Sequence, residues 1–136
     1  VGRNPTKKIL KLIAKEDGIF VTGEVKSVFD YIKTSSLAIA PMQSGSGMQN
    51  KIIEAMACKV PVVTTSLGLG DIGAANEKSI IIADDPNIYA KKIVNLLLNK
   101  SKRIKIGLNG KKYVFDNHDI LSLNNIFINQ VKSILR

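Results

Sequence analysis

Apolar residues along the chain follow two different spacings, and the two spacings alternate. Four short apolar runs, which are typical of buried strands, occupy residues 19–22, 37–40, 61–65 and 79–83. Segments with an apolar residue at every third or fourth position, which is typical of amphipathic helices, cover residues 4–17, 25–32, 47–58, 86–97, 101–115 and 123–135. Glycine and proline fall between these segments, and this supports the predicted boundaries.

Short apolar strands that alternate with helices are expected to form a parallel sheet with helices on both faces. We predict an α/β fold with about four to five parallel strands and a group of helices toward the C-terminal end. With 136 residues, the chain is long enough for one hydrophobic core and too short for two ordinary domains. We therefore treat residues 1–136 as a single unit.

Positive charge exceeds negative charge, with 20 Lys and Arg residues against 11 Asp and Glu residues and a formal net charge of +9. Nearly all of the basic residues are Lys, and aromatic residues make up only 5% of the chain. Nucleic-acid-binding surfaces usually cluster basic residues, often with Arg and stacking aromatics. We therefore expect no nucleic-acid partner and interpret most lysines as solvated surface residues. Attraction to acidic lipid or polyphosphate is the alternative.

The single cysteine, the single histidine and the length of the apolar runs exclude several classes of protein. Cys58 is the only cysteine and His118 the only histidine, so we expect neither an intrachain disulfide nor a Cys/His metal site. No apolar run approaches the roughly 18 residues that a membrane-spanning helix requires. These features predict a protein of a reducing, cytoplasmic compartment, without a metal and without a cofactor.

The loop after the second apolar run is the strongest candidate binding site. In parallel α/β sheets, ligands bind where strands end and helices begin. Gly45 and Gly47 allow the backbone to approach a ligand closely, and the following helix offers free amide groups and the positive end of its dipole. We expect these groups to bind a diphosphate, and the residues concerned are Ser46, Gly47, Met48, Gln49 and Lys51. The spacing matches neither a Walker loop nor the G-x-G-x-x-G motif, and a capped loop without a ligand is the alternative.

Glu54 places a carboxylate within an otherwise apolar helical segment. A buried carboxylate is costly unless a partner satisfies it. Glu54 follows Gly47 by seven residues, almost two helical turns, so we predict that both lie on one helix face together with Lys51. A nucleotide would then place its diphosphate on the helix N-terminus and its ribose hydroxyls on Glu54. The alternative is a structural ion pair between Glu54 and a lysine that lines the core.

The residues from Ile39 to Thr65 resemble the donor-binding signature of GT-B glycosyltransferases, specifically the large retaining group known as family 4 or group 1. The resemblance lies in the order of a strand, Pro41, a glycine-containing loop, a helix with Glu-Ala-Met-Ala, and the run Pro-Val-Val-Thr-Thr. Residues 20–25 and 79–86 resemble segments that flank this signature in the family. The resemblance covers nearly the whole chain and implies a Rossmann-like parallel sheet.

Taken position by position, the resemblance implies roles for individual residues. Glu54 matches the second Glu of the family's E-x7-E element, which holds the nucleotide ribose, whereas Ser46 stands in the place of the first Glu. We therefore assign no catalytic residue. Glu24 and Val25 match the loop that contacts the nucleobase through backbone atoms. The resemblance also implies that residues 1–136 are part of the donor-binding C-terminal domain, without the N-terminal acceptor domain and the first strands of the domain itself.

The activity that the resemblance implies is transfer of a sugar from a nucleotide diphosphate sugar to an acceptor hydroxyl, with retention, in polysaccharide or cell-envelope glycan synthesis. The implied partners are this donor, an acceptor glycan or lipid-linked glycan, and the missing N-terminal domain. The expected location is the cytoplasm, with peripheral attachment at the inner face of the membrane as a further possibility. We expect the isolated fragment to be inactive and to self-associate through its uncovered sheet edge. Two alternatives remain: a nucleotide-sugar epimerase on a GT-B scaffold, which the single His118 disfavours, and a non-catalytic basic module that binds nucleotide or lipid.

Overall fold

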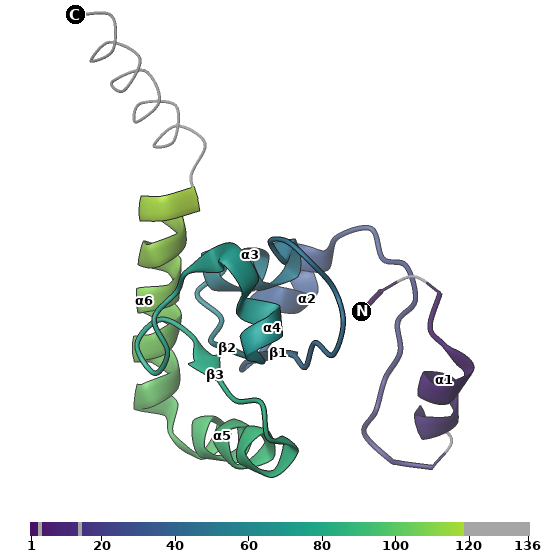
Figure 1. Cartoon of the computed structure of the whole chain (residues 1–136). Coiled ribbons are helices and arrows are strands. Elements are labelled where there is room, and N and C mark those ends of the chain that lie inside the picture. Colours follow the sequence, from purple (N-terminus) through teal and green to yellow (C-terminus); the bar gives the residue numbers. More distant parts are fainter. Residues whose placement is uncertain (3, 14, 119–136) are drawn as a thin grey trace, which may run out of the picture.

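Three parallel strands form the centre of the chain: β1 (Ala38–Ala40), β2 (Val62–Thr64) and β3 (Ile81–Ile82). They are hydrogen-bonded in the order β1-β2-β3, and the register places Ala38 beside Val62. The computed structural model describes residues 1–2, 4–13 and 15–118, and Figure 1 shows the arrangement of their elements. The α/β class and the parallel sheet are confirmed. Within this described part the sheet has three strands instead of the predicted four to five.

The prediction of a strand at residues 19–22 is wrong, because this segment is not paired with the sheet. Phe20 is 85% exposed, and Figure 1 shows the chain on either side of α1 (Lys7–Ile13) standing apart from the strands. A strand exists only when a neighbouring backbone accepts and donates its hydrogen bonds. The apolar run therefore stays extended without becoming a strand, since none of the described strands lies beside it.

Seven helical elements accompany the sheet among the described residues: α1, α2 (Val28–Thr34), α3 (Asn50–Ala57), α4 (Ser66–Leu69), the 3-10 helix η1 (Gly70–Ile72), α5 (Pro86–Leu98) and α6 (Lys100–His118). The predicted helices between residues 4 and 115 are confirmed in position, although α1 and α2 are shorter than predicted. The short elements α4 and η1 were not predicted. The helix predicted over residues 123–135 lies outside the described residues.

The third helix begins three residues later than predicted, at Asn50 and not at Gly47. Gly45 and Gly47 have positive φ angles of 130° and 69°, which a right-handed helix does not allow. These two glycines therefore form a turn ahead of the helix.

Helices cover both faces of the sheet, as predicted. On one face, Ile52 and Met56 of α3 pack with Val62 and with Val114 of α6. On the other face, Tyr89 and Leu96 of α5 pack with Val63, Ile81 and Ile106. Successive residues of a strand point to opposite faces, so Val62 and Val63 belong to different clusters.

Helix α6 runs along one side of the molecule and contributes to both clusters (Figure 1). Two buried glycines allow its close approach: a Cβ atom at Gly107 would lie 2.1 Å from the Lys59 carbonyl oxygen, and one at Gly110 would lie 2.9 Å from the Ser79 carbonyl oxygen. No helix in the described part of the chain has both the length and the apolar composition that crossing a membrane requires.

Candidate functional site

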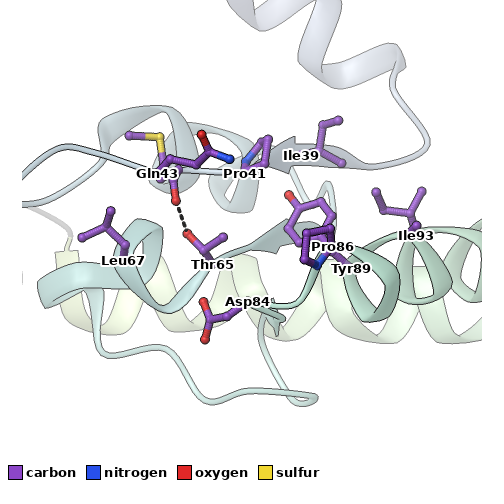
Figure 2. A pocket seen from close by; sticks show the side chains of 11 residues that line it. Ile39, Pro41, Gln43, Thr65, Leu67, Asp84, Pro86, Tyr89 and Ile93 are labelled. Carbon is purple, nitrogen blue, oxygen red and sulfur yellow. Dashed lines mark hydrogen bonds between the residues drawn. The ribbon is translucent and has the colours of Figure 1, made fainter.

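A cavity of about 640 Å³ opens where the three strands end, and we call it the strand-end cavity (Figure 2). Its lining residues come from β1, from the segments that follow the three strands and from the first turns of α5: Ile39, Pro41, Met42, Gln43, Thr65, Leu67, Asp84, Pro86, Tyr89, Ala90 and Ile93. Ligands in parallel α/β proteins bind at this end of the strands. The lining is mainly apolar, with the polar groups of Gln43, Thr65 and Asp84 at its rim.

Tyr89 anchors α5 to the floor of the strand-end cavity. Its hydroxyl donates a hydrogen bond of 2.6 Å to the Val63 carbonyl oxygen and accepts one of 3.1 Å from the Ala40 amide. Burial raises the pKa of the Tyr89 hydroxyl above its ordinary value of 10.0. The side chain is therefore a neutral hydrogen-bonding group, and it links β1, β2 and α5 at one point.

Thr65 joins the segments that follow β1 and β2. Its hydroxyl donates to the Met42 carbonyl oxygen at 2.9 Å, the bond drawn in Figure 2. The same oxygen accepts from the Gly68 amide at 3.1 Å and so caps α4. A Cβ atom at Gly68 would lie 2.2 Å from the Thr64 hydroxyl oxygen, so glycine is required where α4 crosses the strand ends.

Asp84 and Asp85 follow β3 and have different partners. Asp84 accepts two hydrogen bonds of 2.7 Å, from the amide and from the hydroxyl of Ser66. These bonds, the one from the hydroxyl first, hold the pKa of Asp84 below its ordinary value of 3.8. Asp85 accepts from the amides of Asn87 and Ile88 and so caps α5.

The residues predicted to hold a diphosphate lie outside the strand-end cavity. Ser46, Gly47 and Met48 are exposed and precede α3. The Gln49 side-chain amide donates to the carbonyl oxygens of Ser46 and Gly47, at 3.3 and 3.5 Å, which closes this loop onto itself through carbonyl groups. Since α3 begins at Asn50, its first two amides have no acceptor within the helix, and the next two donate to the Gln49 carbonyl oxygen.

Gly47 and Glu54 do not share a helix face, because Gly47 is not part of α3. The predicted spacing of almost two turns between them is therefore wrong. Lys51 and Glu54 are both in α3 and three residues apart, a separation that places side chains on the same face of a helix. Of the three residues predicted to share one helix face, α3 therefore brings together only Lys51 and Glu54.

Glu54 is partly buried in the second turn of α3, between the buried residues Ile52 and Ala55. Within the described residues, no side chain or amide donates a hydrogen bond to its carboxylate, and no lysine there lies within ion-pair distance of it. The alternative of a structural ion pair with a core-lining lysine is thus not seen in this part of the chain. A partly desolvated carboxylate without a partner retains its capacity to accept hydrogen bonds from a ligand.

Glu24 and Val25, the predicted nucleobase contacts, line a separate cavity of about 330 Å³ with Val1, Gly2, Gly23 and Val28. The Gly2 amide donates to the Gly23 carbonyl oxygen at 3.1 Å and holds this turn. The cavity has no lining residue in common with the strand-end cavity. The turn that holds Glu24 and Val25 therefore does not border the strand-end cavity.

His118 is engaged at the end of α6. Its Nε2 atom lies 3.1 Å from the Ile72 carbonyl oxygen, and its ring lies 5.8 Å from the Tyr113 ring. Tyr113 donates to the same carbonyl group at 2.8 Å. These contacts fasten η1 to α6, which is a structural role.

The sequence reasoning missed the polar rim of the strand-end cavity. Thr65 is the last residue of the apolar run 61–65, and Asp84 follows directly on the run 79–83. A position at the end of a run was the signal that could have found them. Tyr89 lies within the helix predicted over residues 86–97, and that prediction gave it no role of its own. Its hydrogen bonds to β1 and β2 join residues 49 and 26 positions apart, and such pairings have no local sequence pattern.

Comparison with known proteins identifies the family. Residues 1–99 match the family model described as "Glycosyl transferases group 1". A protein of Klebsiella pneumoniae named "Uncharacterized 44.6 kDa protein in cps region" is 30% identical over 96 residues, which are 71% of this chain and 24% of that protein. "Uncharacterized glycosyltransferase MJ1178" of Methanocaldococcus jannaschii is 30% identical over 114 residues, 79% of this chain and 32% of that protein. The chain belongs to the group 1 glycosyltransferase family, and it spans about a quarter to a third of the length of these relatives.

Solved structures agree with this assignment. TarM shares the fold with a TM-score of 0.76 at 24% identity, over 90% of this chain and 26% of TarM. A variant of S. aureus TarM in complex with fondaparinux, alpha-GlcNAc-glycerol and UDP gives a TM-score of 0.74 at 25% identity, with the same coverage of 90% and 26%. The C-terminal domain of the Francisella tularensis group 1 family protein LpcC gives 0.64 at 19% identity, over 75% of this chain and 53% of that domain. The fold described above is therefore that of a GT-B glycosyltransferase.

Proposed function

We propose that this chain is part of the donor-binding domain of an enzyme that transfers a sugar from a nucleotide diphosphate sugar to an acceptor hydroxyl, with retention. The observation that carries the proposal is the partly buried Glu54 carboxylate, which has no hydrogen-bond partner among the described residues, on the same short helix as Lys51. Membership of the group 1 family supports it. The TarM structure that contains UDP supports a nucleotide as the ligand.

In this proposal the N-terminal end of α3 binds the donor diphosphate. The amides of Asn50 and Lys51 have no acceptor within the helix, and the exposed ammonium group of Lys51 adds a positive charge. As the bond between sugar and diphosphate breaks, negative charge grows on the leaving group, and fixed amide dipoles with a cation stabilise it. Ser46, Gly47 and Met48 contribute through their backbone amides, in the turn before the helix.

Glu54 holds the other part of the nucleotide. An ionised carboxylate accepts hydrogen bonds from two neighbouring hydroxyl groups, and the ribose of a nucleotide carries such a pair. Glu24 and Val25 then contact the base through their backbone once residues 23–25 are brought to α3 by the rest of the domain. We propose that residues 1–136 are a single, partial domain and that an N-terminal acceptor domain completes the site.

We assign the strand-end cavity to the interior of that complete domain. Ile39 of β1 is 56% exposed and lines the cavity beside the unpaired edge of the sheet. Further strands would pair with this edge and cover Ile39 and Ile93, and without them the fragment is expected to self-associate and to be inactive. For the complete enzyme we propose a role in polysaccharide or cell-envelope glycan synthesis.

Steady-state kinetics of the intact transferase test the proposal. Replacing Glu54 by Ala is expected to raise the donor KM and to lower kcat/KM by about tenfold to a hundredfold, since a charge-assisted hydrogen bond contributes about 1.5–3 kcal/mol. Asp30 is an exposed carboxylate of α2, and Asp30→Ala is the matched control, expected to leave kcat/KM unchanged. An unchanged donor KM and kcat in Glu54→Ala would remove the basis of the proposal.

A further inference from the structure

Helix α6 carries an apolar stripe on its outer side, which we define as Ile104, Leu108 and Phe115. These side chains are 52%, 50% and 50% exposed. They follow one another at intervals of four and seven residues, which places them in one row along a helix. The opposite side of α6 packs against the molecule through Ile106, Gly107, Gly110 and Val114, so the sheet makes no use of the stripe.

Lysines surround the stripe. Lys111 lies within the same row, and its ammonium group is 5.1 Å from the centre of the Phe115 ring. Lys100, Lys105 and Lys112 are exposed at positions next to the row. Lys112 pairs with Asp116 at 2.7 Å. In the described part of the chain, no acidic side chain pairs with the other three lysines.

Two further basic residues of α6 have partners inside the molecule. Lys102 pairs with Glu77 at 3.1 Å, and the Arg103 guanidinium donates to the carbonyl oxygens of Leu96 and Leu97. The lysines around the stripe are thus distinct from the basic residues that hold α5 and α6 together. They leave a surface that combines exposed apolar side chains with uncompensated positive charge.

We propose that this face of α6 lies flat on the surface of a bilayer that contains acidic phospholipid. A helix of this kind inserts its apolar side chains at the boundary between headgroups and acyl chains, while the flanking lysines meet the phosphate groups. The net charge of +9 acts in the same direction. The partner follows from charge complementarity, because a negatively charged surface matches a ring of lysines and a neutral one does not.

Sedimentation of the 136-residue chain with lipid vesicles tests the proposal. One set of vesicles contains phosphatidylcholine alone, and in the other phosphatidylglycerol replaces part of it. The chain is expected to bind the acidic vesicles and not the neutral ones, and added salt is expected to weaken binding. Equal binding to both sets, or binding to neither, would overturn the proposal.

Three variants separate the stripe from the general charge of the protein. The triple replacement Ile104→Ser, Leu108→Ser and Phe115→Ser keeps every lysine and is expected to weaken vesicle binding about tenfold or more. The double replacement Lys100→Gln and Lys105→Gln keeps the stripe and is expected to weaken binding to a similar extent at low salt. The control is Phe20→Ser, which removes an exposed aromatic side chain from the segment between α1 and α2, a segment that lies apart from α6 in Figure 1. This variant is expected to bind as the original chain does.

If the triple variant binds the acidic vesicles as strongly as the original chain does, the proposal is overturned. Vesicle binding would then depend on charge alone or on another part of the chain. Circular dichroism of each variant checks that α6 is still folded. Two observations would assign the face to another partner and equally overturn the proposal: a dimer in light scattering that the triple replacement dissociates, or binding to RNA that is lost in the same variant. Neither result would bear on the role of Glu54 in donor binding.

Discussion

The Tyr89 hydroxyl donates a hydrogen bond of 2.6 Å to the carbonyl oxygen of Val63. Because Tyr89 is in the first turns of α5 and Val63 is in β2, this bond fixes the helix to the sheet directly below the strand-end cavity. The same hydroxyl accepts a hydrogen bond from the amide of Ala40 at 3.1 Å, so one oxygen atom satisfies polar groups of two strands.

Replacing Tyr89 by Phe is expected to lower the free energy of unfolding by about 1–3 kcal/mol, because it removes the two buried hydrogen bonds of the hydroxyl group. Urea denaturation measures the change, with an unchanged m-value. Tyr31 is 45% exposed, and Tyr31→Phe is the control, for which no change is expected. Equal stability of Tyr89→Phe and the original chain would show that the two bonds do not hold α5 to the sheet.

Replacing Gly107 by Ala is expected to destabilise the chain by about 1–3 kcal/mol or to shift α6 away from α3. The added Cβ atom would lie 2.1 Å from the Lys59 carbonyl oxygen, which is backbone and moves only with the end of α3. Thermal unfolding followed by circular dichroism measures the loss. Ser101→Ala, at an exposed position of the same helix, serves as the control. If Ser101→Ala lowers the stability as much as Gly107→Ala does, the steric explanation is contradicted.

Replacing Glu77 by Gln is expected to lower stability slightly, by about 0.2–1 kcal/mol near neutral pH, because the ion pairs are largely exposed. Hydrogen bonds from Lys92, with a further contribution from Lys102, hold the pKa of Glu77 below its ordinary value of 4.5. A lowered pKa in the folded state means that the carboxylate stabilises the fold above pH 4.5 and that this contribution is lost as the pH falls through the folded-state value.

Chemical denaturation of both chains across the acid range checks the prediction for Glu77. The difference between Glu77→Gln and the original chain should be present at neutral pH, shrink on acidification and decrease when salt is added. A difference that grows toward acid pH would contradict the assigned ion pairs.

Much of the fold could be predicted because its signals are local. The apolar runs around Ala38–Ala40 and Val62–Thr64 are strands in the structure, and the helix predicted over residues 86–97 is α5 (Pro86–Leu98). The run at residues 19–22 has a similar composition, yet it is not a strand, since pairing depends on a neighbour that composition does not reveal. The helix α3 begins later than predicted because Gly45 and Gly47 have positive φ angles. The spacing of apolar residues contains no information about such angles.

The candidate site was predicted less completely than the fold. Glu54 could be singled out because a carboxylate is conspicuous among Ile52, Ile53 and Ala55. The bonds from Ser66 to Asp84 and from Thr65 to Met42 join different segments at the strand ends. They follow from the order of the strands in the sheet, which no local pattern encodes.

The central claim is that Glu54 binds the ribose of the donor nucleotide, and calorimetry with two ligands tests it most directly. The intact transferase and its Glu54→Ala variant are each titrated with a nucleoside diphosphate and with its 2′-deoxy counterpart. The account predicts that the original enzyme prefers the ribose form by about tenfold and that the variant binds both forms equally, because removing either the hydroxyl or the carboxylate removes the same hydrogen bond. A preference for the ribose form that persists undiminished in Glu54→Ala would contradict the account.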